Sequence, residues 1–411
     1  MRGPDEQSAG AGIAEDALAP RKTPSLAILV AISALQPFAL NVLAPATPGL
    51  ARALATDYAT IQLTLTVYLA TVAVTQLFVG PISDRIGRRP CILAGIGLFL
   101  LGSLLGALAG SIETLLMSRV VQAAGGGTCF ALARAVVRDT AGKDKAASMI
   151  GYITMAMVVS PMVAPFIGGV LDEAYGWRSI FVAMAAMAFV VAVAAFMLLH
   201  ETAPCKAASS MTDVLRGFPI LLGNPAFLFY TIALSFVTAA FFVFIAGAPY
   251  VVVEEMARSP QVYGLYFMMN AGGYMIGNFV TGRFGQRIGS VRLVLVGTVI
   301  STFAMLIALY FAVIGPWNPP TLFIPLALSA IGNGLTIPGA TAAALSVRPD
   351  LAGTAAGISG AAQLGAGAVA AVITGLVVEL YAPSIVILML ACTLLGLAGA
   401  WFARWYEMRS A

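Results

Sequence analysis

Long apolar stretches, each ended by a Pro, a Gly or a group of charges, follow one another along almost the whole chain. A helix needs about 20 apolar residues to cross the hydrocarbon core of a bilayer, and each stretch is of roughly this length. Backbone polar groups in lipid must be paired within their own segment, so we expect helices. We predict twelve spans, at residues 25–47, 57–80, 91–109, 113–137, 146–171, 178–199, 224–252, 260–282, 291–314, 320–344, 353–378 and 384–405.

A long polar segment between the sixth and seventh spans divides them six and six, and short patterns recur on either side of it. Gly80 to Pro90 and Gly282 to Arg292 share a leading Gly and the run Arg-Ile-Gly. An Ala-Pro pair at Ala44 recurs at Ala248. Duplicated bundles place a substrate site near the midplane between them. We expect a disordered cytoplasmic tail at 1–24, six-helix bundles at 25–199 and 224–405, a cytoplasmic linker at 200–223 and a second tail at 406–411.

Composition supports the same class of protein. Hydrophobic residues make up 60% of the 411 positions and charged residues 10%. So little polar surface cannot cover a soluble protein of this size, which indicates an integral membrane protein surrounded by the lipid bilayer. We expect it to be a multi-pass protein of the cytoplasmic (inner) membrane and a monomer.

The cations give an orientation. If the termini and the even-numbered loops share one side, 18 of the 22 Lys and Arg residues lie there, three lie opposite and Arg119 lies inside a span. Cytoplasmic loops retain Lys and Arg, so both termini are expected in the cytoplasm. The net charge of +4 is thus a sign of topology, and without a concentrated basic patch we expect no nucleic-acid partner.

Catalytic chemistry finds little support in the sequence. The four cysteines are scattered without CxxC spacing, and His200 is the single histidine. No zinc-protease motif, nucleophile elbow or phosphate-binding loop is present. We therefore expect no catalytic residues, metal or cofactor, and we set aside a membrane-bound enzyme or receptor.

The segment GPISDRIGRRP, from Gly80 to Pro90, places one carboxylate among several arginines after an apolar span. A plain cytoplasmic anchor does not account for the Asp or the glycines, whereas a tight, ion-paired turn does. The segment resembles the signature loop of the major facilitator superfamily. That resemblance implies a twelve-helix, all-α fold of two bundles and a conformational latch at Gly80, Asp84, Arg85, Gly87, Arg88, Arg89 and Asp139. In the second copy Gln286 replaces the Asp, which predicts a weaker latch or only an anchor.

A second resemblance lies in the fourth span, SRVVQAAGGG. Arg119 is about two turns into this span, where a charge is costly unless it faces a cavity or a partner, and Gln122 shares its helix face. The family's motif links this Arg to proton coupling. The alternative is a structural arginine paired with backbone carbonyls.

The fifth span resembles the antiporter motif of drug exporters in the same superfamily. Its small residues allow close helix packing, and generic small-residue packing is the alternative. The matching positions are Gly151, Ser160, Ala164, Pro165, Gly168 and Gly169, where Ser160 and Ala164 replace glycines. The motif implies export.

The segments NVLAPATP and ARAVVRD, with the first loop, are similar to the bicyclomycin and chloramphenicol resistance branch, the Bcr/CflA group. This resemblance covers nearly the whole chain and implies drug efflux in exchange for protons. Asn41 stands where members commonly carry an aspartate, and an amide cannot carry a proton. No Asp, Glu, Lys or His lies clearly within a span, so coupling through Arg119 and a rim carboxylate, or no coupling, both stay open; the rim candidates are Asp57, Glu113, Glu254 and Glu255.

The resembled fold also indicates which spans line a cavity. Their soft and amide side chains suit largely apolar, neutral or weakly polar ligands, and the missing carboxylate disfavours organic cations. For any one of these residues, packing against lipid or another helix is the alternative. The set is Gln36, Asn41, Tyr68, Met155, Phe236, Phe241, Tyr266, Met269, Asn270 and Gln363.

From the sequence we therefore expect a secondary transporter that exports small drugs by alternating access, with protons as coupling ions. The alternative is a metabolite exporter or importer of the same fold without conventional proton coupling, and Asn41 is the residue that favours it.

Overall fold

The structure is a computed structural model that describes residues 24–140, 143–202, 218–348 and 351–410. In these parts every regular element is helical, as the apolar pattern predicts. The first half of the chain forms α2 (Leu26–Val42), the 3-10 turn η1 (Ala44–Ala46), α3 (Thr47–Ala53), α4 (Tyr58–Ile86), α5 (Arg88–Ala107), α6 (Ile112–Thr140), α7 (Lys143–Tyr175) and α8 (Arg178–Leu198).

The second half repeats this plan. It forms α10 (Pro225–Tyr250), the π-helical turn η2 (Val251–Glu255), α11 (Pro260–Ile288), α12 (Ser290–Val313), α13 (Pro319–Ser346), α14 (Ala352–Val378) and α15 (Ser384–Ser410). Several helices extend beyond the predicted spans, because a helix can project past the apolar core into the polar boundary: α7 begins at Lys143 and α11 ends at Ile288.

Local sequence explains where the helices begin. Asp57 caps α4 by accepting a 2.9 Å hydrogen bond from the backbone N–H of Thr60. Asn224 accepts from the backbone N–H of Phe227 at the start of α10. Between α4 and α5 stands Gly87, and between α11 and α12 stands Gly289, with φ of 110° and 85°. Only Gly adopts such conformations without strain, so the same residue ends the second helix of each half.

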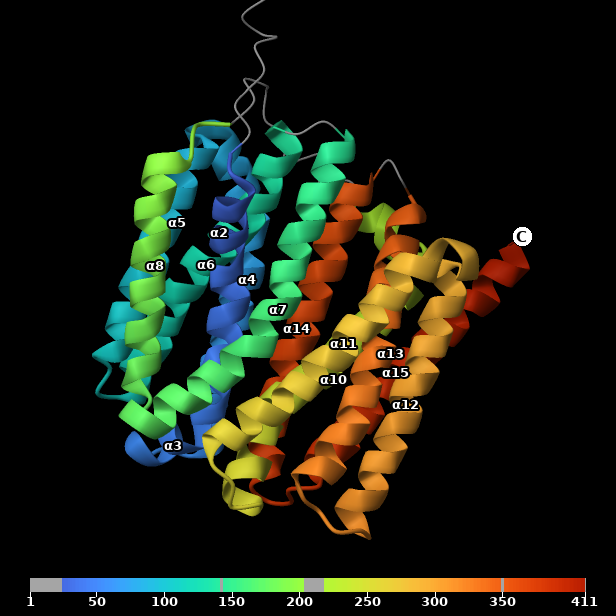
Figure 1. Ribbon diagram of the computed structural model, residues 1–411. Helices are drawn as coiled ribbons and strands as arrows, with labels where there is room; N and C mark the ends of the chain where they lie inside the picture. The colour runs from blue at the N-terminus through green and yellow to red at the C-terminus, as the bar shows by residue number, and fades with distance from the viewer. Residues whose placement is uncertain (1–23, 141–142, 203–217, 349–350, 411) are drawn as a thin grey trace, which may run out of the picture.

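The two halves lie side by side and touch most closely at one end (Figure 1). There α7 packs on α11 and α4 packs on α14. Glycines allow the approach: a Cβ on Gly169 would lie 2.6 Å from the Pro260 carbonyl oxygen, and one on Gly375 would lie 3.0 Å from Gln62. We call this the α3 end, and the opposite end, where α4 meets α5, the Gly87 end.

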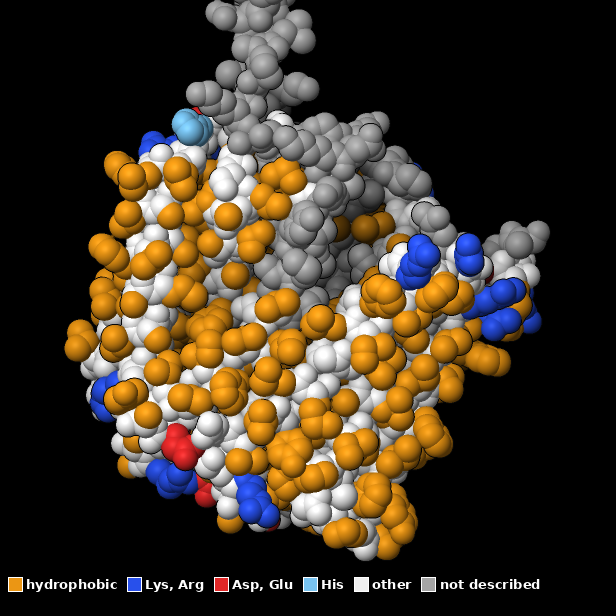
Figure 2. Space-filling view, viewed as in Figure 1, with side chains coloured by type: hydrophobic (Ala, Val, Ile, Leu, Met, Phe, Trp, Pro, Cys, Tyr) orange, Lys and Arg blue, Asp and Glu red, His pale blue; other side chains and the backbone are white. Residues whose placement is uncertain are grey.

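Apolar side chains cover most of the face of the molecule that Figure 2 shows. Phe196, Phe279 and Leu380 are among the large hydrophobic residues that are mostly exposed. In the part of the chain that the structure describes, ten helical segments are long and apolar enough to cross a membrane. An apolar surface of this extent needs a lipid environment, so the chain is a multi-pass membrane protein.

Candidate substrate cavity and buried ion pairs

A cavity of about 410 Å³ lies between the halves. Helices of both halves supply its walls, which are mostly apolar and aromatic with several amides, as is usual for a small-molecule site. The lining residues that the structure describes include no Asp or Glu. Its polar and aromatic lining consists of Gln36, Asn41, Gln76, Arg134, Thr238, Asn270, Asn333, Gln363, Phe130, Phe241, Phe242, Phe267 and Tyr274.

Half of the ten residues predicted for the cavity line it, namely Gln36, Asn41, Phe241, Asn270 and Gln363. Their amides are already partly engaged. Asn41 donates a 2.8 Å hydrogen bond to the Pro37 carbonyl, and its buried Oδ1 has no partner among the described residues. Gln363 accepts a hydrogen bond from the hydroxyl of Thr238.

Four other predicted residues do not belong to this lining. Tyr68 is buried beneath Arg119, and Tyr266 packs on Phe323 with ring centroids 5.4 Å apart. Met269 is 42% exposed on the outer face of α11, which fits the lipid-facing alternative, and Phe236 is partly buried outside the lining. These residues lie on the predicted helices but on other faces, because the predicted spans do not fix the rotation of a helix. Met155 lies outside the residues whose side chains are described.

Arg119 is fully buried within the first half. It donates to the side-chain oxygen of Gln122 and, over 3.1 Å, to the carbonyl of Ala39, and its guanidinium lies 4.2 Å from the ring centroid of Tyr68. Gln122 in turn donates to the hydroxyl of Ser103 at 2.8 Å. Carbonyl, amide and ring partners therefore surround this charge, while its buried Nε has no hydrogen-bond partner among the described residues. Its part in proton coupling stays a prediction.

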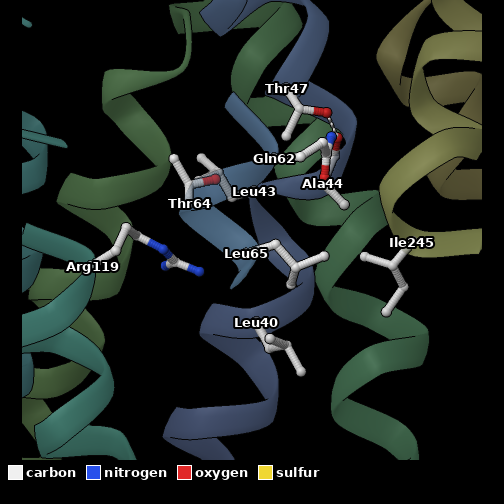
Figure 3. Close-up of a pocket in the computed structure, with 9 residues that line it drawn as sticks. All are labelled: Leu40, Leu43, Ala44, Thr47, Gln62, Thr64, Leu65, Arg119 and Ile245. Atoms are coloured by element: carbon white, nitrogen blue, oxygen red, sulfur yellow. Dashed lines mark hydrogen bonds between the residues drawn. The ribbon is translucent and has the colours of Figure 1, made fainter. Parts of the chain in front are cut away.

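The space beside Arg119 is a small hollow of about 20 Å³, separate from the central cavity (Figure 3). Arg119 reaches it from α6 and Gln62 from α4. A space of this size holds about one water molecule, so it is too small for a drug. The central cavity, at about 410 Å³, is large enough for a small molecule.

The loop at the Gly87 end holds a buried ion-pair cluster. The guanidinium of Arg88 is 3% exposed and reaches Asp84 at 2.7 Å and Asp139 at 2.9 Å. The helix ends bring these groups together, because α4 ends at Ile86, α5 begins at Arg88 and α6 extends to Thr140. All three helices belong to the first half, so these ion pairs do not join the halves.

Glu201, which the sequence analysis missed, completes this cluster. Its carboxylate accepts hydrogen bonds from the backbone N–H groups of Arg88 at 2.9 Å and Arg89 at 3.2 Å, which are the first two residues of α5. A carboxylate there also offsets the positive end of the helix dipole. Of the remaining predicted latch residues, Arg85 is exposed, Gly80 is partly buried, and Arg89 binds the Phe196 carbonyl at 2.9 Å. The position of Glu201, an acidic residue just after the sixth predicted span, was the feature of the sequence that could have indicated its part in the cluster.

The predicted motif in α7 lies at helix contacts. The position of Gly168 leaves no room for a side chain against the Val42 carbonyl of α2, and Gly169 faces α11 of the other half. Ala164 is fully buried, and the hydroxyl of Ser160 lies 3.5 Å from the Ala34 carbonyl. A Cβ on Gly264 of α11 would lie 2.6 Å from the carbonyl oxygen of Pro165. Gly151 lies outside the residues whose side chains are described.

At the α3 end, polar contacts join the two halves. Arg52 pairs with Glu254, and the hydroxyl of Tyr58 donates a 2.6 Å hydrogen bond to the Ala246 carbonyl. The backbone N–H of Tyr58 donates to Glu379 at 3.3 Å. Two of the rim carboxylates suggested as proton carriers are therefore engaged elsewhere, since Glu254 pairs with Arg52 and Asp57 caps α4.

Two helical halves around a shared cavity define a multi-pass transporter. The chain belongs to the Major Facilitator Superfamily, whose family model matches residues 29–255 and 232–410. The structure agrees with that of a bacterial homologue of the human lysosomal transporter Spinster, described as inward-facing and occupied. The TM-score is 0.73 at 18% identity, over 93% of this chain and 96% of that one.

Curated relatives confirm the resemblance to the drug-resistance branch. The chain is 30% identical to Multidrug resistance protein D of Escherichia coli (strain K12) over 84% of this chain and 87% of that protein. It is 26% identical to a Bicyclomycin resistance protein homolog of Haemophilus influenzae over 92% and 96%. It is 33% identical to a Chloramphenicol resistance protein of Pseudomonas aeruginosa over 61% and 58%.

Proposed function

We propose that this protein exports small, largely apolar drugs or antibiotics, such as phenicols or bicyclomycin-like molecules, across the cytoplasmic membrane in exchange for protons. The observation that carries the proposal is the apolar cavity between the two halves, with amides and without a described carboxylate in its lining. Because the described lining holds no carboxylate that would need a cationic ligand, a neutral or weakly polar ligand suits this site. The names of the relatives support the drug class.

Alternating access is the motion that this proposal requires. The described contacts that join the halves gather at the α3 end, through Arg52 with Glu254 and through Tyr58 with the Ala246 carbonyl. With both termini cytoplasmic, the α3 end faces outward, and these contacts close the cavity on that side. Export then needs them to separate while the Gly87 end closes, which is a change between two packed states.

The ion-pair cluster at Arg88 acts in this scheme as a latch inside the first half. Because Asp84, Arg88 and Asp139 all belong to that half, opening of the Gly87 end does not itself break their pairs, in contrast to what the loop motif alone suggests. We assign the cluster the role of holding α4, α5 and α6 as one rigid unit that moves against the second half.

The test is the accumulation of labelled chloramphenicol in cells that lack their own efflux pumps, with and without this protein. Export by the proposed mechanism lowers accumulation, and a protonophore restores it to the level of cells without the protein. Equal accumulation with and without the protein, across a panel of phenicols and bicyclomycin, would reject drug export.

A second function on the same fold is metabolite transport without conventional proton coupling. Asn41 favours it, because its amide lines the cavity at the position where the resemblance to this branch implies an aspartate, and an amide does not titrate. Export that persists in the presence of the protonophore supports this alternative. Asn41→Asp then introduces pH dependence, and an unchanged pH profile of transport in that variant removes Asn41 from the account.

A further inference from the structure

Arg134 is the single charged side chain in the described lining of the central cavity. It lies on α6 one turn after Phe130, and its guanidinium carbon lies over that ring, 4.2 Å from the centroid. The side chain is partly buried, within the stretch Ile112–Val137 that is apolar enough to cross a membrane. By the pattern of charges along the chain, Arg134 is one of the 18 Lys and Arg residues expected on the cytoplasmic side.

Arg134 differs from the two fully enclosed arginines of the same half. Arg88 has two carboxylates within 3 Å, and Arg119 has a carbonyl, an amide and an aromatic ring. For Arg134 the structure records, among the described residues, the contact with Phe130 and no ion pair or hydrogen bond. Arg134 lies in the last turn of this stretch and lines the cavity, where an ionisable group normally pairs or marks a substrate site. Its five N–H donors have no protein acceptor among those residues.

The rest of the lining fits the same ligand chemistry. Phe130, Phe241 and Phe267 offer apolar surface for a ring system, and no described acidic residue lies in the lining to repel a negative charge. A guanidinium placed over an aromatic ring is already partly ordered, so it loses less side-chain entropy when its N–H groups bind a carboxylate or sulfonate.

We propose that Arg134 is an anion-binding residue of the cavity and that the substrates include amphipathic organic anions, with an aromatic body and a carboxylate or sulfonate. The aromatic body lies against the Phe side chains and the acid pairs with Arg134. This inference rests on the proposed function, because it takes the central cavity as the substrate site, and it adds amphipathic organic anions to the substrates named there.

The experiment measures equilibrium binding of two dyes to the full-length protein in phosphatidylcholine nanodiscs, with empty nanodiscs subtracted. 8-Anilinonaphthalene-1-sulfonate is the anionic probe, and N-phenyl-1-naphthylamine has the same ring scaffold without the sulfonate. Zwitterionic lipid removes anionic headgroups as competitors. Variants Arg134→Gln and Arg134→Lys are compared with Arg404→Gln, which removes one positive charge from an exposed position on α15.

Arg134→Gln should weaken binding of the sulfonate dye about tenfold, the effect of one charge-assisted hydrogen bond, and change the neutral dye by less than about twofold. Arg134→Lys should fall between the wild type and Arg134→Gln, and Arg404→Gln should match the wild type. The neutral dye shows in each variant that the cavity is intact.

Equal weakening of both dyes would assign Arg134 to packing and overturn the inference. So would unchanged binding of the sulfonate dye in Arg134→Gln, or no binding of that dye to the wild type. These results concern dye binding alone, so none of them would reject the proposal of drug export. Conversely, loss of export in the accumulation test would reject the proposed function without deciding whether Arg134 binds anions.

Discussion

The loop between α4 and α5 and the loop between α11 and α12 have the same backbone plan and different side chains. Each turns at a glycine with positive φ, Gly87 in the first half and Gly289 in the second. After Gly87 comes the buried Arg88 with its two carboxylates, whereas after Gly289 comes Ser290. Among the described residues, the second loop forms no ion pair. The two loops thus share the turn, while among the described residues the charge cluster lies in the first loop.

This difference teaches that the turn and the latch are separable. A turn needs only a residue that tolerates the backbone angle, whereas a buried ion pair needs three helix ends placed to within hydrogen-bond distance. Both loops contain the same glycine turn, and the first also contains the ion-pair cluster. The difference between matched substitutions in the two loops therefore measures what the cluster contributes to stability and transport.

The largest difference is expected at the position after the glycine. Arg88→Ala removes the cation shared by Asp84 and Asp139 and should lower the free energy of unfolding by about 3 kcal/mol, because a broken buried pair leaves carboxylates in an apolar site. Ser290→Ala should cost less than about 0.5 kcal/mol. Unfolding by SDS in mixed micelles measures both, and equal losses would show that the cluster contributes nothing beyond the turn.

The glycines themselves come next. Gly87→Ala should cost about 2 kcal/mol and Gly289→Ala about 1 kcal/mol, because both strain the backbone but only one creates a clash. A Cβ on Gly87 would lie 2.6 Å from the Glu201 carboxylate, whereas one on Gly289 meets nothing within 4 Å. The same unfolding measurement applies, and a Gly289 variant as unstable as the Gly87 variant would remove Glu201 from the account.

Asp84 should affect transport more than stability. Its side chain is 26% exposed, so Asp84→Asn should cost about 1 kcal/mol or less and leave the protein inserted and folded. Export of chloramphenicol from cells should nevertheless be lost, because the latch loses one of its two carboxylates. Gln286→Asn at the matching position of the second loop is the control and should export normally. Normal export by Asp84→Asn would sink the latch hypothesis.

The smallest expected effect is on stability and concerns the residues at the starts of α4 and α11, the helices that precede the two loops. Hydrogen bonds from the Thr60 side chain, and then from its backbone N–H, lower the pKa of Asp57. Because the pKa is lowered on folding, Asp57 stabilises the fold above the ordinary Asp range and loses this effect as the pH falls through its folded value. Asp57→Ala should therefore be slightly less stable than the wild type at pH 7 and equal to it at low pH.

Ser259 stands at the equivalent start of α11 and makes no side-chain cap hydrogen bond, so Ser259→Ala should change stability at neither pH. The unfolding midpoint of each variant, measured against wild type across this pH range, checks both statements. A difference for Asp57→Ala that does not vary with pH would contradict the charge-based cap.

The fold was largely predictable from the sequence, because twenty-residue apolar stretches have few alternatives in lipid. Of the five predicted residues that line the cavity, all but Phe241 are amides, which avoid lipid and therefore indicate which helix face points inward. Aromatic and Met residues carry no such signal, since lipid and protein are equally apolar for them. Tyr266 and Met269 were therefore assigned to the cavity and lie elsewhere.

Contacts between distant segments were not predictable. Arg52 and Glu254 are 202 positions apart, and their pairing depends on how the halves pack. Glu201 reaches the start of α5 from beyond α8. The contact between Arg134 and Phe130 was predictable, because the two residues are one helical turn apart and such spacing brings a cation over a ring. Its place in the cavity still required the second half to be positioned.

The central claim is that substrate passes through the cavity between the halves, and one pair of glycines on α14 tests it directly. Gly360 lines the cavity and Gly365 is exposed, and a side chain at either meets nothing within 4 Å, so both accept Phe without a clash at Cβ. Uptake of labelled chloramphenicol into energised inside-out vesicles should be lost in Gly360→Phe, where the ring fills the cavity, and retained in Gly365→Phe. Uptake by Gly360→Phe at the rate of the wild type, with equal amounts of protein in the membrane, would contradict the account.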